Sequence, residues 1–574
     1  MFIRLSVLYE AVVLKGILIM DLSKANLKNV EFWNGINVVL PKYDIDACIN
    51  ATTANPTWLH VGGGNIFRAF IARINQRLLN QGLADTGIVV CGTQDYENFE
   101  RVYKPFDNLS IICDLRPDGN TGYEIIGNIT EAIAANYDIE ENIKRLNEIA
   151  ASPSLQIVSF TITEKGYALR DADGNLYDSA AKDMENGPSH PLTCMGFIAA
   201  LLFERYKAGK YPLALVSMDN CSHNGDKLKS SVLEIIDAWV DKGYVDSSFR
   251  DYASDPSRIA YPWSMIDKIT PRPSDEILNK LTGLGIDNLK SVKTTTGVFA
   301  APFVNAEVPE YLVVEDLFPN GRPALDKGGV ILTDRDTVDK AERMKVTACL
   351  NPLHTSLAIF GCLLGFTKIS EEMKDEDLKT LVNKLGYNEC LPVVCDPKIL
   401  NPEKFLKEVL EERFPNPFLP DTPQRIATDT SQKLPIRFGI TLSSYLEQDP
   451  DVLPKLKLIP LVIAGWLRYL LAVDDNGNAF EISPDPMAEH FQNELKAQGI
   501  SYKMEGSVSG KLSGILSNET VFGLDINKTG LTPVIEKYLD ELIKENGASR
   551  GSSRCAGVRC RVYRHQERVE RPDQ

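Results

Sequence analysis

Short apolar runs alternate with amphipathic stretches over the first half of the chain. Four of these runs are rich in β-branched residues and have the length of strands buried on both faces of a sheet. The stretch 65–82, which follows the first run, has helical periodicity and ends at a glycine. This alternation predicts an α/β domain with a doubly wound, Rossmann-type sheet. The four runs occupy residues 58–63, 87–92, 155–163 and 213–220, and a fifth at 109–115 is expected to be antiparallel or mixed.

From about residue 300 the spacing of apolar residues changes to the helical period. We therefore expect a Rossmann-type dinucleotide-binding domain over 25–300 and a mainly α-helical substrate and catalytic domain over 301–548. The segment TTTGVFAAPF marks the predicted boundary. The helical segments are 341–365, 371–386, 402–414 and 460–473.

Both ends of the chain differ from its body in composition. Residues 1–24 open with an apolar stretch that charged residues interrupt, and its uninterrupted part is too short to span a bilayer. It has no small-residue cleavage site, so a signal peptide is disfavoured and we expect an extension with Met20 as the start. Residues 549–574 contain seven arginines and no lysine, which indicates a disordered or artefactual tail.

The overall charge narrows the range of partners. The 574 residues include 78 Asp and Glu against 62 Lys and Arg, and the formal net charge is -16. An acidic surface repels phosphate backbones, so nucleic acid is not an expected partner. A membrane is not expected either, because the apolar run at the start of the chain is too short to span one. A protein that binds an acidic partner through the arginine tail remains one alternative, and the sequence leaves the oligomeric state undetermined.

The cysteines and histidines suggest a reducing compartment and a metal-independent site. Eleven cysteines are dispersed without a Cys-x-x-Cys pair, which is typical of reduced thiols in a cytoplasmic protein. None of the six histidines pairs with a cysteine at zinc-ligand spacing. We expect no zinc site, although this pattern leaves carboxylate ligands open.

Three glycines separate the first predicted strand from the first predicted helix. In a doubly wound sheet a dinucleotide pyrophosphate rests at this turn, because glycine permits close approach and the helix N-terminus offers N–H donors. A tight turn without a ligand is the alternative, since the spacing departs from the usual Gly-x-Gly-x-x-Gly. An acid after the second strand would hold the ribose hydroxyls and favour NAD, with NADP left open. The candidate cofactor-binding residues are Gly62, Gly63, Gly64, Asn65, Ile66, Arg68 and Asp95.

The turn LHVGGGNIFRAF (59–70) resembles the corresponding turn of the mannitol dehydrogenase family, the polyol-specific long-chain dehydrogenases. The resemblance extends over about residues 25–545. It implies a Rossmann-type N-terminal domain, a helical C-terminal domain, an active site between them and a mechanism without a metal. Six later blocks match in family order: TITEKGY (161–167), SMDNCSHNG (217–225), SMIDKITP (264–271), LFPNGRP (317–323), KVTACLNPLH (345–354) and RIATDTSQKLP (425–435).

The family resemblance implies a set of catalytic residues. Lys345 matches the general acid/base, although an isolated lysine is more often exposed on a surface. Burial beside a positive nicotinamide would lower its pKa from about 10.4 toward neutrality. Asn220 and Asn351 match the two asparagines that stabilise the developing alkoxide. Without the resemblance, Asn220 would be equally consistent with an Asx turn.

The resemblance also assigns a histidine and two cations. His354 matches a histidine that the family pairs with an aspartate, here Asp267, and such a carboxylate fixes the ring orientation and tautomer. Arg425 and Lys433 match positions that bind oxygens of the substrate. Without the resemblance, His354 would more often be a buried structural residue. Arg425 and Lys433 would then belong to a solvated charged loop.

The spacing between the lysine and the asparagine departs from the family pattern. The family places the asparagine five positions after the lysine, whereas Asn351 lies six after Lys345. On an unbroken α-helix one extra residue rotates the lysine by about 100°. A π-bulge or a break must therefore absorb it. Pro352 favours the first turn of a helix, so we expect the helix to kink or restart at residues 351–352.

The resemblance implies NAD(P)-dependent oxidation and reduction between a ketose or keto-uronate and its polyol or aldonate. D-fructuronate to D-mannonate is the first choice of reaction. The alternatives are tagaturonate reduction, mannitol 2-dehydrogenation and a catalytically silent relative that only binds a ligand. The expected partner is therefore a small sugar acid or polyol.

Overall fold

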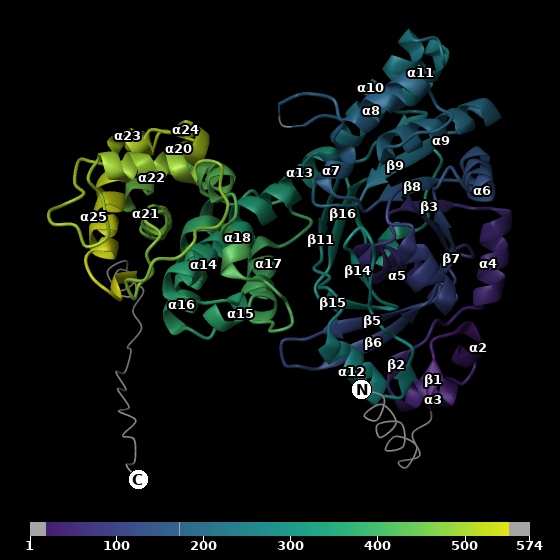
Figure 1. Ribbon diagram of the computed structural model, residues 1–574, viewed down its shortest axis with the longest axis horizontal. Helices are drawn as coiled ribbons and strands as arrows, with labels where there is room; N and C mark the ends of the chain where they lie inside the picture. The colour runs from purple at the N-terminus through teal and green to yellow at the C-terminus, as the bar shows by residue number, and fades with distance from the viewer. Residues whose placement is uncertain (1–18, 172, 550–574) are drawn as a thin grey trace. The chain divides into compact units, whose positions relative to one another are not determined.

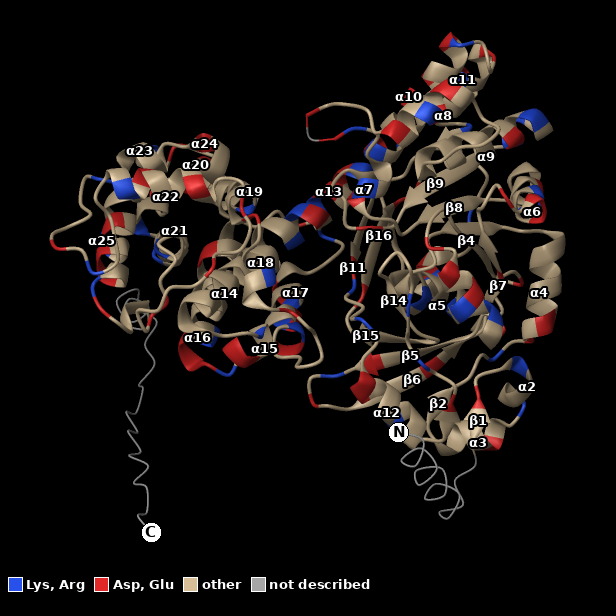
Figure 2. Cartoon of the chain, in the orientation of Figure 1, with Lys and Arg blue, Asp and Glu red and all other residues tan. Residues whose placement is uncertain are grey.

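The computed structural model describes residues 19–171 and 173–549 (Figure 1). The chain divides into two compact units, 1–339 and 340–574. Predictions for residues 1–18 and 550–574 lie outside the described residues. Acidic and basic positions are interspersed over both units (Figure 2).

A six-stranded sheet forms the centre of the first unit, and neighbouring strands in it are parallel. This confirms the predicted Rossmann-type sheet and four of its strands. The two outer strands, β10 and β7, were not predicted from the sequence. In spatial order the strands are β10 (Ile259–Ala260), β9 (Leu213–Ser217), β8 (Ile157–Phe160), β3 (Trp58–Val61), β4 (Ile88–Gly92) and β7 (Ile129–Ala134).

Alternate residues of the central strands belong to two different cores, because successive side chains of a strand point to opposite faces. Leu59 and Val61 contribute to a core with helices of one layer, whereas Trp58 and Val90 contribute to a second core. The sheet is therefore covered on both faces, as the continuous apolar runs predicted. The principal helices of this unit are α5 (Ala72–Asn80), α6 (Glu140–Ala151), α9 (Cys194–Gly209) and α10 (Asn224–Asp241).

Two smaller sheets extend the first unit beyond the predicted boundary near residue 300. Strand β5 (Ser110–Leu115) is antiparallel to β6 (Thr121–Ile126) and parallel to β15 (Phe303–Glu307), so this sheet is mixed. A second sheet has the order β11 (Ser264–Asp267), β16 (Tyr311–Glu315) and β17 (Ile331–Thr333). Because β15 and β16 pair with strands of the first unit, the division falls at residue 339 rather than near 300.

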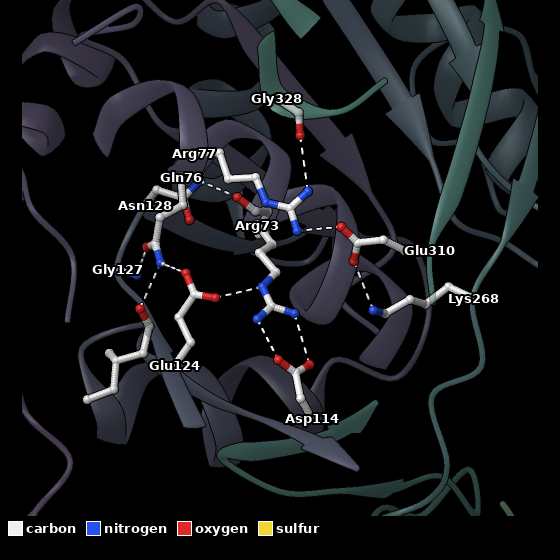
Figure 3. A network of polar contacts seen from close by, with 12 residues as sticks. Arg73, Gln76, Arg77, Asp114, Glu124, Gly127, Asn128, Lys268, Glu310 and Gly328 are labelled. Atoms are coloured by element: carbon white, nitrogen blue, oxygen red, sulfur yellow. Dashed lines mark hydrogen bonds and ion pairs between the residues drawn. The ribbon is translucent and has the colours of Figure 1, made fainter. Parts of the chain in front are cut away.

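A charged network joins helix α5 to both smaller sheets (Figure 3). Arg73 donates to both carboxylate oxygens of Asp114, at 2.9 and 2.7 Å, and to Glu124 at 2.6 Å. Arg77 and Lys268 both contact the carboxylate of Glu310, which lies just before β16. The network fixes the helix that follows the glycine turn.

The second unit is mainly helical, as predicted. Helix α21 (Leu458–Tyr469) is its apolar centre and contacts α14 (Asn351–Leu364) and α25 (Thr532–Ile543). The buried carboxylate of Glu389 accepts bonds from backbone N–H groups at the start of α21, which satisfies donors that a helix leaves free there. Further helices are α15 (Ile369–Glu372), α16 (Glu376–Lys384), α17 (Pro402–Glu408), α18 (Pro423–Ala427), α19 (Thr430–Leu434), α20 (Ile440–Gln448) and α22 (Ala488–Ala497).

The described ends of the chain are part of the fold. Strand β1 (Met20–Asp21) pairs with β12 (Ile286–Asp287), so the last residues of the extension predicted over 1–24 belong to the first unit. Ser549 donates its backbone N–H and its hydroxyl to Asp475. The predicted tail therefore includes at least one residue that is anchored in the second unit.

Among the described residues one helical run, Arg335–Leu364, passes the length and composition test for a membrane span, and 78% of its apolar window is buried. Core helices commonly pass this test, so the result is weak evidence for a membrane span. The run comprises α13 (Arg335–Met344), a π-helical turn and α14.

Glu372 is a fully buried carboxyl group, with 0% of the residue exposed, and it packs against Gly361 of α14. Neither of its oxygens has a hydrogen-bond partner among the described residues. Burial, and then the nearby charge of Asp375, raises its pKa well above the usual value of 4.5. The protonated form is therefore favoured in the folded protein.

Replacing Glu372 with Gln is expected to stabilise the protein more at pH 8 than at pH 5. At a pH above the pKa that Glu372 has in the unfolded chain, the carboxyl must take up a proton when the protein folds. The free energy of unfolding therefore falls as pH rises from that value toward the higher pKa of the folded protein. We expect a gain of about 1 kcal/mol or more at pH 8. Urea unfolding at both pH values measures it. Glu371→Gln, on an exposed neighbour, should show no such pH dependence.

Candidate functional site

The glycine turn lies at the carboxyl end of β3, between the ends of β4 and β8. The Gly62 N–H donates to the carbonyl oxygen of Cys91 at 2.8 Å. Gly62 has a φ of +116°, and a Cβ there would lie 2.7 Å from the carbonyl oxygen of Thr161. This position therefore requires glycine for both conformation and space.

The next two glycines differ in their surroundings. The carbonyl oxygen of Gly63 accepts bonds from Asn98 Nδ2 and from the Tyr103 hydroxyl, both at 2.8 Å. A Cβ on Gly64 would meet no described atom within 4 Å. Hydrogen bonds to Gly63 thus fix the turn, and the space beside Gly64 is open. This arrangement fits the close approach of a dinucleotide phosphate. Sequence reasoning missed Asn98 and Tyr103, since no motif distinguishes them.

Helix formation begins at Asn65 and Ile66, and Arg68 lies within the first turns. The Arg68 side chain is fully buried and donates to the carbonyl oxygen of Ala301 at 2.6 Å and to Asn65 Oδ1 at 2.8 Å. Burial lowers the pKa of its guanidinium. These bonds make Arg68 a support of the turn, and direct contact with a cofactor phosphate stays a prediction.

Asp95 lies three residues after β4, at the carboxyl edge of the sheet where the glycine turn also lies. Its backbone has a φ of 53°, in the left-handed region that Asp tolerates better than most residues. Its carboxylate accepts a hydrogen bond from the Thr296 hydroxyl at 2.8 Å. The placement suits a contact with ribose hydroxyls, which stays a prediction.

Substituting Ala at Gly64 is expected to weaken cofactor binding at least tenfold without lowering thermal stability. The added Cβ meets no described protein atom, so only a ligand in the turn would be displaced. Gly62→Ala should instead lower the melting temperature, because its Cβ would overlap Thr161. Calorimetry and cofactor titration separate the two outcomes. Unchanged affinity in Gly64→Ala would place the phosphates elsewhere.

The segments of two predicted catalytic residues are tied together in the first unit. Asn220 is exposed in the loop after β9, and Asp267 is the buried last residue of β11. Asn224 links them, since its Nδ2 donates to Ser264 Oγ at 3.0 Å and its Oδ1 accepts from the Ser264 N–H at 3.1 Å. The structure thus holds the Asn220 loop against strand β11.

The predicted break between Lys345 and Asn351 is confirmed. Helix α13 ends at Met344, a π-helical turn covers Lys345–Cys349, and α14 begins at Asn351 with a proline in its first turn. The Leu350 N–H donates to the carbonyl oxygen of Lys345 at 3.1 Å, which is the wider π spacing. The π-helical turn therefore lies between the buried Lys345 and Asn351, where we expected an extra residue to be absorbed.

His354 lies in the first turn of α14, and its ring centroid is 5.1 Å from that of Phe414. Its Nε2 is 3.6 Å from Asp421 Oδ2. Burial lowers its pKa well below the usual value of 6.5, and four nearby cations lower it further. The imidazole is therefore neutral near pH 7. The four cations are Arg437, Arg425, Arg413 and Lys433.

Arg425, Lys433 and Arg437 approach His354 from one segment of the second unit. Arg425 forms an ion pair with Asp421. The Lys433 Nζ donates to backbone carbonyl oxygens of residues 426 and 428, and burial and Arg437 lower its pKa to about 8. Arg437 donates to the Thr355 hydroxyl and to the Asn351 carbonyl oxygen.

Sequence reasoning named two of the four cations. Arg437 follows Lys433 by four positions, which places both on one helix face and is a signal that was available. Arg413 had no such signal. Of the predicted residues, Lys345, Asn351 and His354 follow one another on the helical run of the second unit, and the charges of Arg425 and Lys433 act on the histidine.

No cluster of three or more potential metal ligands occurs among residues 19–171 and 173–549. The protein groups that the two units present are amides, cations, an imidazole and a glycine turn. Such groups can bind an anionic cofactor and an oxygen-rich substrate and can transfer a proton.

Comparison with known proteins identifies relatives over most of the chain. The models of the mannitol dehydrogenase Rossmann domain and C-terminal domain match residues 56–327 and 337–543. D-mannonate oxidoreductase of Thermotoga maritima is 50% identical over 527 residues, which are 91% of this chain and 96% of that protein. Polyol:NADP oxidoreductase of Gluconobacter oxydans is 29% identical, over 80% of this chain and 88% of that protein.

Two solved structures share the architecture. The ternary complex of Pseudomonas fluorescens mannitol 2-dehydrogenase with NAD and D-mannitol is 27% identical, covers 93% of this chain and 99% of its own, and has a TM-score of 0.66. A substrate-free D-sorbitol dehydrogenase has a TM-score of 0.72 at 24% identity, covering 90% of this chain and 97% of its own. The second likeness concerns the fold alone.

Proposed function

We propose that this chain, which belongs to the mannitol dehydrogenase family, is a nicotinamide-dependent oxidoreductase that interconverts D-fructuronate and D-mannonate. The 50% identity to a D-mannonate oxidoreductase supports an aldonate rather than a neutral polyol as the substrate. The observation that carries the proposal is the group of four cations whose charges lower the pKa of His354.

A carboxylate on the substrate explains this cluster. Arginine and lysine side chains form their strongest hydrogen bonds with carboxylate oxygens. Four cations lie near one imidazole in a chain whose formal net charge is -16. A uronate or aldonate brings a negative charge to these cations, whereas a neutral polyol does not.

The chain's own residues supply the proton and the charge stabilisation. In ketone reduction the ammonium of Lys345 gives a proton to the carbonyl oxygen, and in the reverse direction the amine takes it back. The amide groups of Asn220 and Asn351 donate to that oxygen as negative charge develops on it. When bound, the nicotinamide supplies the hydride for reduction or accepts it in oxidation. His354, in its neutral form, donates a hydrogen bond to the substrate or accepts one from it.

The glycine turn would hold the cofactor through backbone N–H groups, with Asp95 at the ribose. A carboxylate in that place favours NAD, because it would repel the 2′-phosphate of NADP. A relative named Polyol:NADP oxidoreductase makes NADP the alternative. A reducing, cytoplasmic environment is part of the proposal, and it is supported by the cysteines between residues 19 and 549, which are free and mostly buried.

A spectrophotometric panel tests the proposed function. Purified protein is offered NADH or NADPH with D-fructuronate, tagaturonate, fructose or fructose 6-phosphate, with and without EDTA. We expect turnover to be fastest with NADH and D-fructuronate and unchanged by EDTA. A faster rate with tagaturonate or fructose would reassign the substrate. The absence of any turnover would favour a catalytically silent relative.

A further inference from the structure

We propose that Asp421 is a positioning residue of this site, which holds the guanidinium of Arg425 with one carboxylate oxygen and the imidazole of His354 with the other. The inference rests on the proposed function, because it concerns how the same substrate site is ordered. It assigns His354 a carboxylate partner that the family resemblance does not name.

Asp421 is placed to bridge two elements. It lies two residues before α18 (Pro423–Ala427), and its carbonyl oxygen accepts a bond from the Ile369 N–H at 3.0 Å. Its Oδ1 accepts from the guanidinium of Arg425, and its Oδ2 lies 3.6 Å from His354 Nε2 on α14. The side chain is only 13% exposed, so packing restricts its rotation.

The bridge orders a residue that would otherwise be flexible. The Arg425 side chain is 64% exposed, and a long exposed side chain loses conformational entropy when it binds a ligand. A carboxylate that already holds the guanidinium reduces this loss at the moment of binding. Asp421 also supplies negative charge beside four cations that repel one another. We therefore expect it to contribute to substrate affinity through Arg425.

The same carboxylate can select the tautomer of His354. A neutral imidazole has a single N–H, and a carboxylate near Nε2 favours its placement there, which leaves Nδ1 as an acceptor. The distance of 3.6 Å exceeds that of a direct hydrogen bond. Contacts of this kind are often long without a ligand and shorten when substrate binds.

The family resemblance instead pairs His354 with Asp267, which lies in the first unit. The two assignments differ in which aspartate controls the histidine tautomer. Asp421→Asn and Asp267→Asn each remove one charge and keep the shape of the side chain. Asp396→Asn is a matched control, because Asp396 is a surface residue of the same unit that pairs with Lys398.

The first test observes the ring directly. Full-length protein labelled with ¹⁵N-histidine is examined by long-range nitrogen–proton NMR, and the His354 signals are assigned with His354→Gln. We expect Asp421→Asn to change the Nδ1 and Nε2 shifts toward the other tautomer, with Asp267→Asn and Asp396→Asn leaving them in place. A change in Asp267→Asn alone would overturn the proposal. Because this test needs no turnover, it is decided independently of the proposed substrate.

The second test is kinetic. With D-fructuronate, Asp421→Asn should raise KM roughly tenfold. The loss of kcat/KM caused by Arg425→Ala should be at least about threefold smaller in the Asp421→Asn variant than in the wild type. Asp421→Glu retains the charge and should recover much of the affinity. Additive effects of the two substitutions would contradict the bridge. If Asp421→Asn melts early, Asp421→Ser, which also removes the charge, takes its place in the same cycle.

Discussion

Replacing Lys345 with Ala is expected to lower kcat about 10³-fold while the affinity for cofactor stays within a factor of two. Lys345 is buried at the first residue of the π-helical turn, close in sequence to Asn351. Without its amine, no other group that we assign to this site carries the proton to the carbonyl oxygen. The cofactor turn belongs to the first unit, so its geometry does not depend on this side chain.

Steady-state rates with D-fructuronate and a fluorescence titration with NADH measure the two quantities separately. Lys404→Ala provides the control, since Lys404 is exposed on α17 of the same unit. Turnover in Lys345→Ala equal to that of the wild type would contradict the role assigned to the lysine. A parallel loss of NADH binding would point to disrupted folding instead of lost proton transfer.

Removing two cations together is expected to lower kcat/KM for D-fructuronate by about 10²- to 10⁴-fold. Arg425→Gln combined with Lys433→Gln deletes two charged donors, and a hydrogen bond to a charged group contributes about 1.5–3 kcal/mol. A ketose without a carboxylate lacks these charged contacts, so its kcat/KM should fall much less. The double variant should therefore lose its preference for the uronate.

The ratio of kcat/KM for D-fructuronate to that for fructose measures this preference. Arg250→Gln is the control, because Arg250 forms an exposed ion pair with Asp237 in the first unit. An equal loss with both substrates would mean that the two cations support the site without recognising a carboxylate. In that case the cation cluster would no longer favour an aldonate.

Local patterns predicted the central sheet well because its strands are buried on both faces. Strands β3, β4, β8 and β9 are continuous apolar runs, and their pairing follows from the rules of doubly wound sheets. The domain boundary predicted near residue 300 differs from the division at residue 339 for a different reason. Strand β15 is recognisable as part of the first unit only through its pairing with β5, far away in the sequence. The spacing of apolar residues within a strand does not indicate which distant strand it pairs with.

The site residues also fall into those that neighbouring residues predict and those that depend on contacts between distant segments. The break before Pro352 followed from one extra residue and one proline, and both are local signals. The burial of Arg68 depends on Ala301 and Ser110, which are distant in sequence, so its role in supporting the turn was not predictable. Asp421 was likewise missed, because its proximity to His354 arises only when α14 and α18 pack together.

The π-helical turn has a consequence for how this chain is compared with its relatives. A turn that absorbs one residue leaves the helices on either side with their own packing, so an insertion there changes the count along the chain more than the arrangement in space. An alignment without a gap, anchored on Asn351, would place Val346 opposite the family's lysine. Val346 carries no proton to give, so on that alignment the chain would lack the general acid/base that we assign to Lys345. Placing the gap within residues 346–350 aligns Lys345 with that lysine, as we propose.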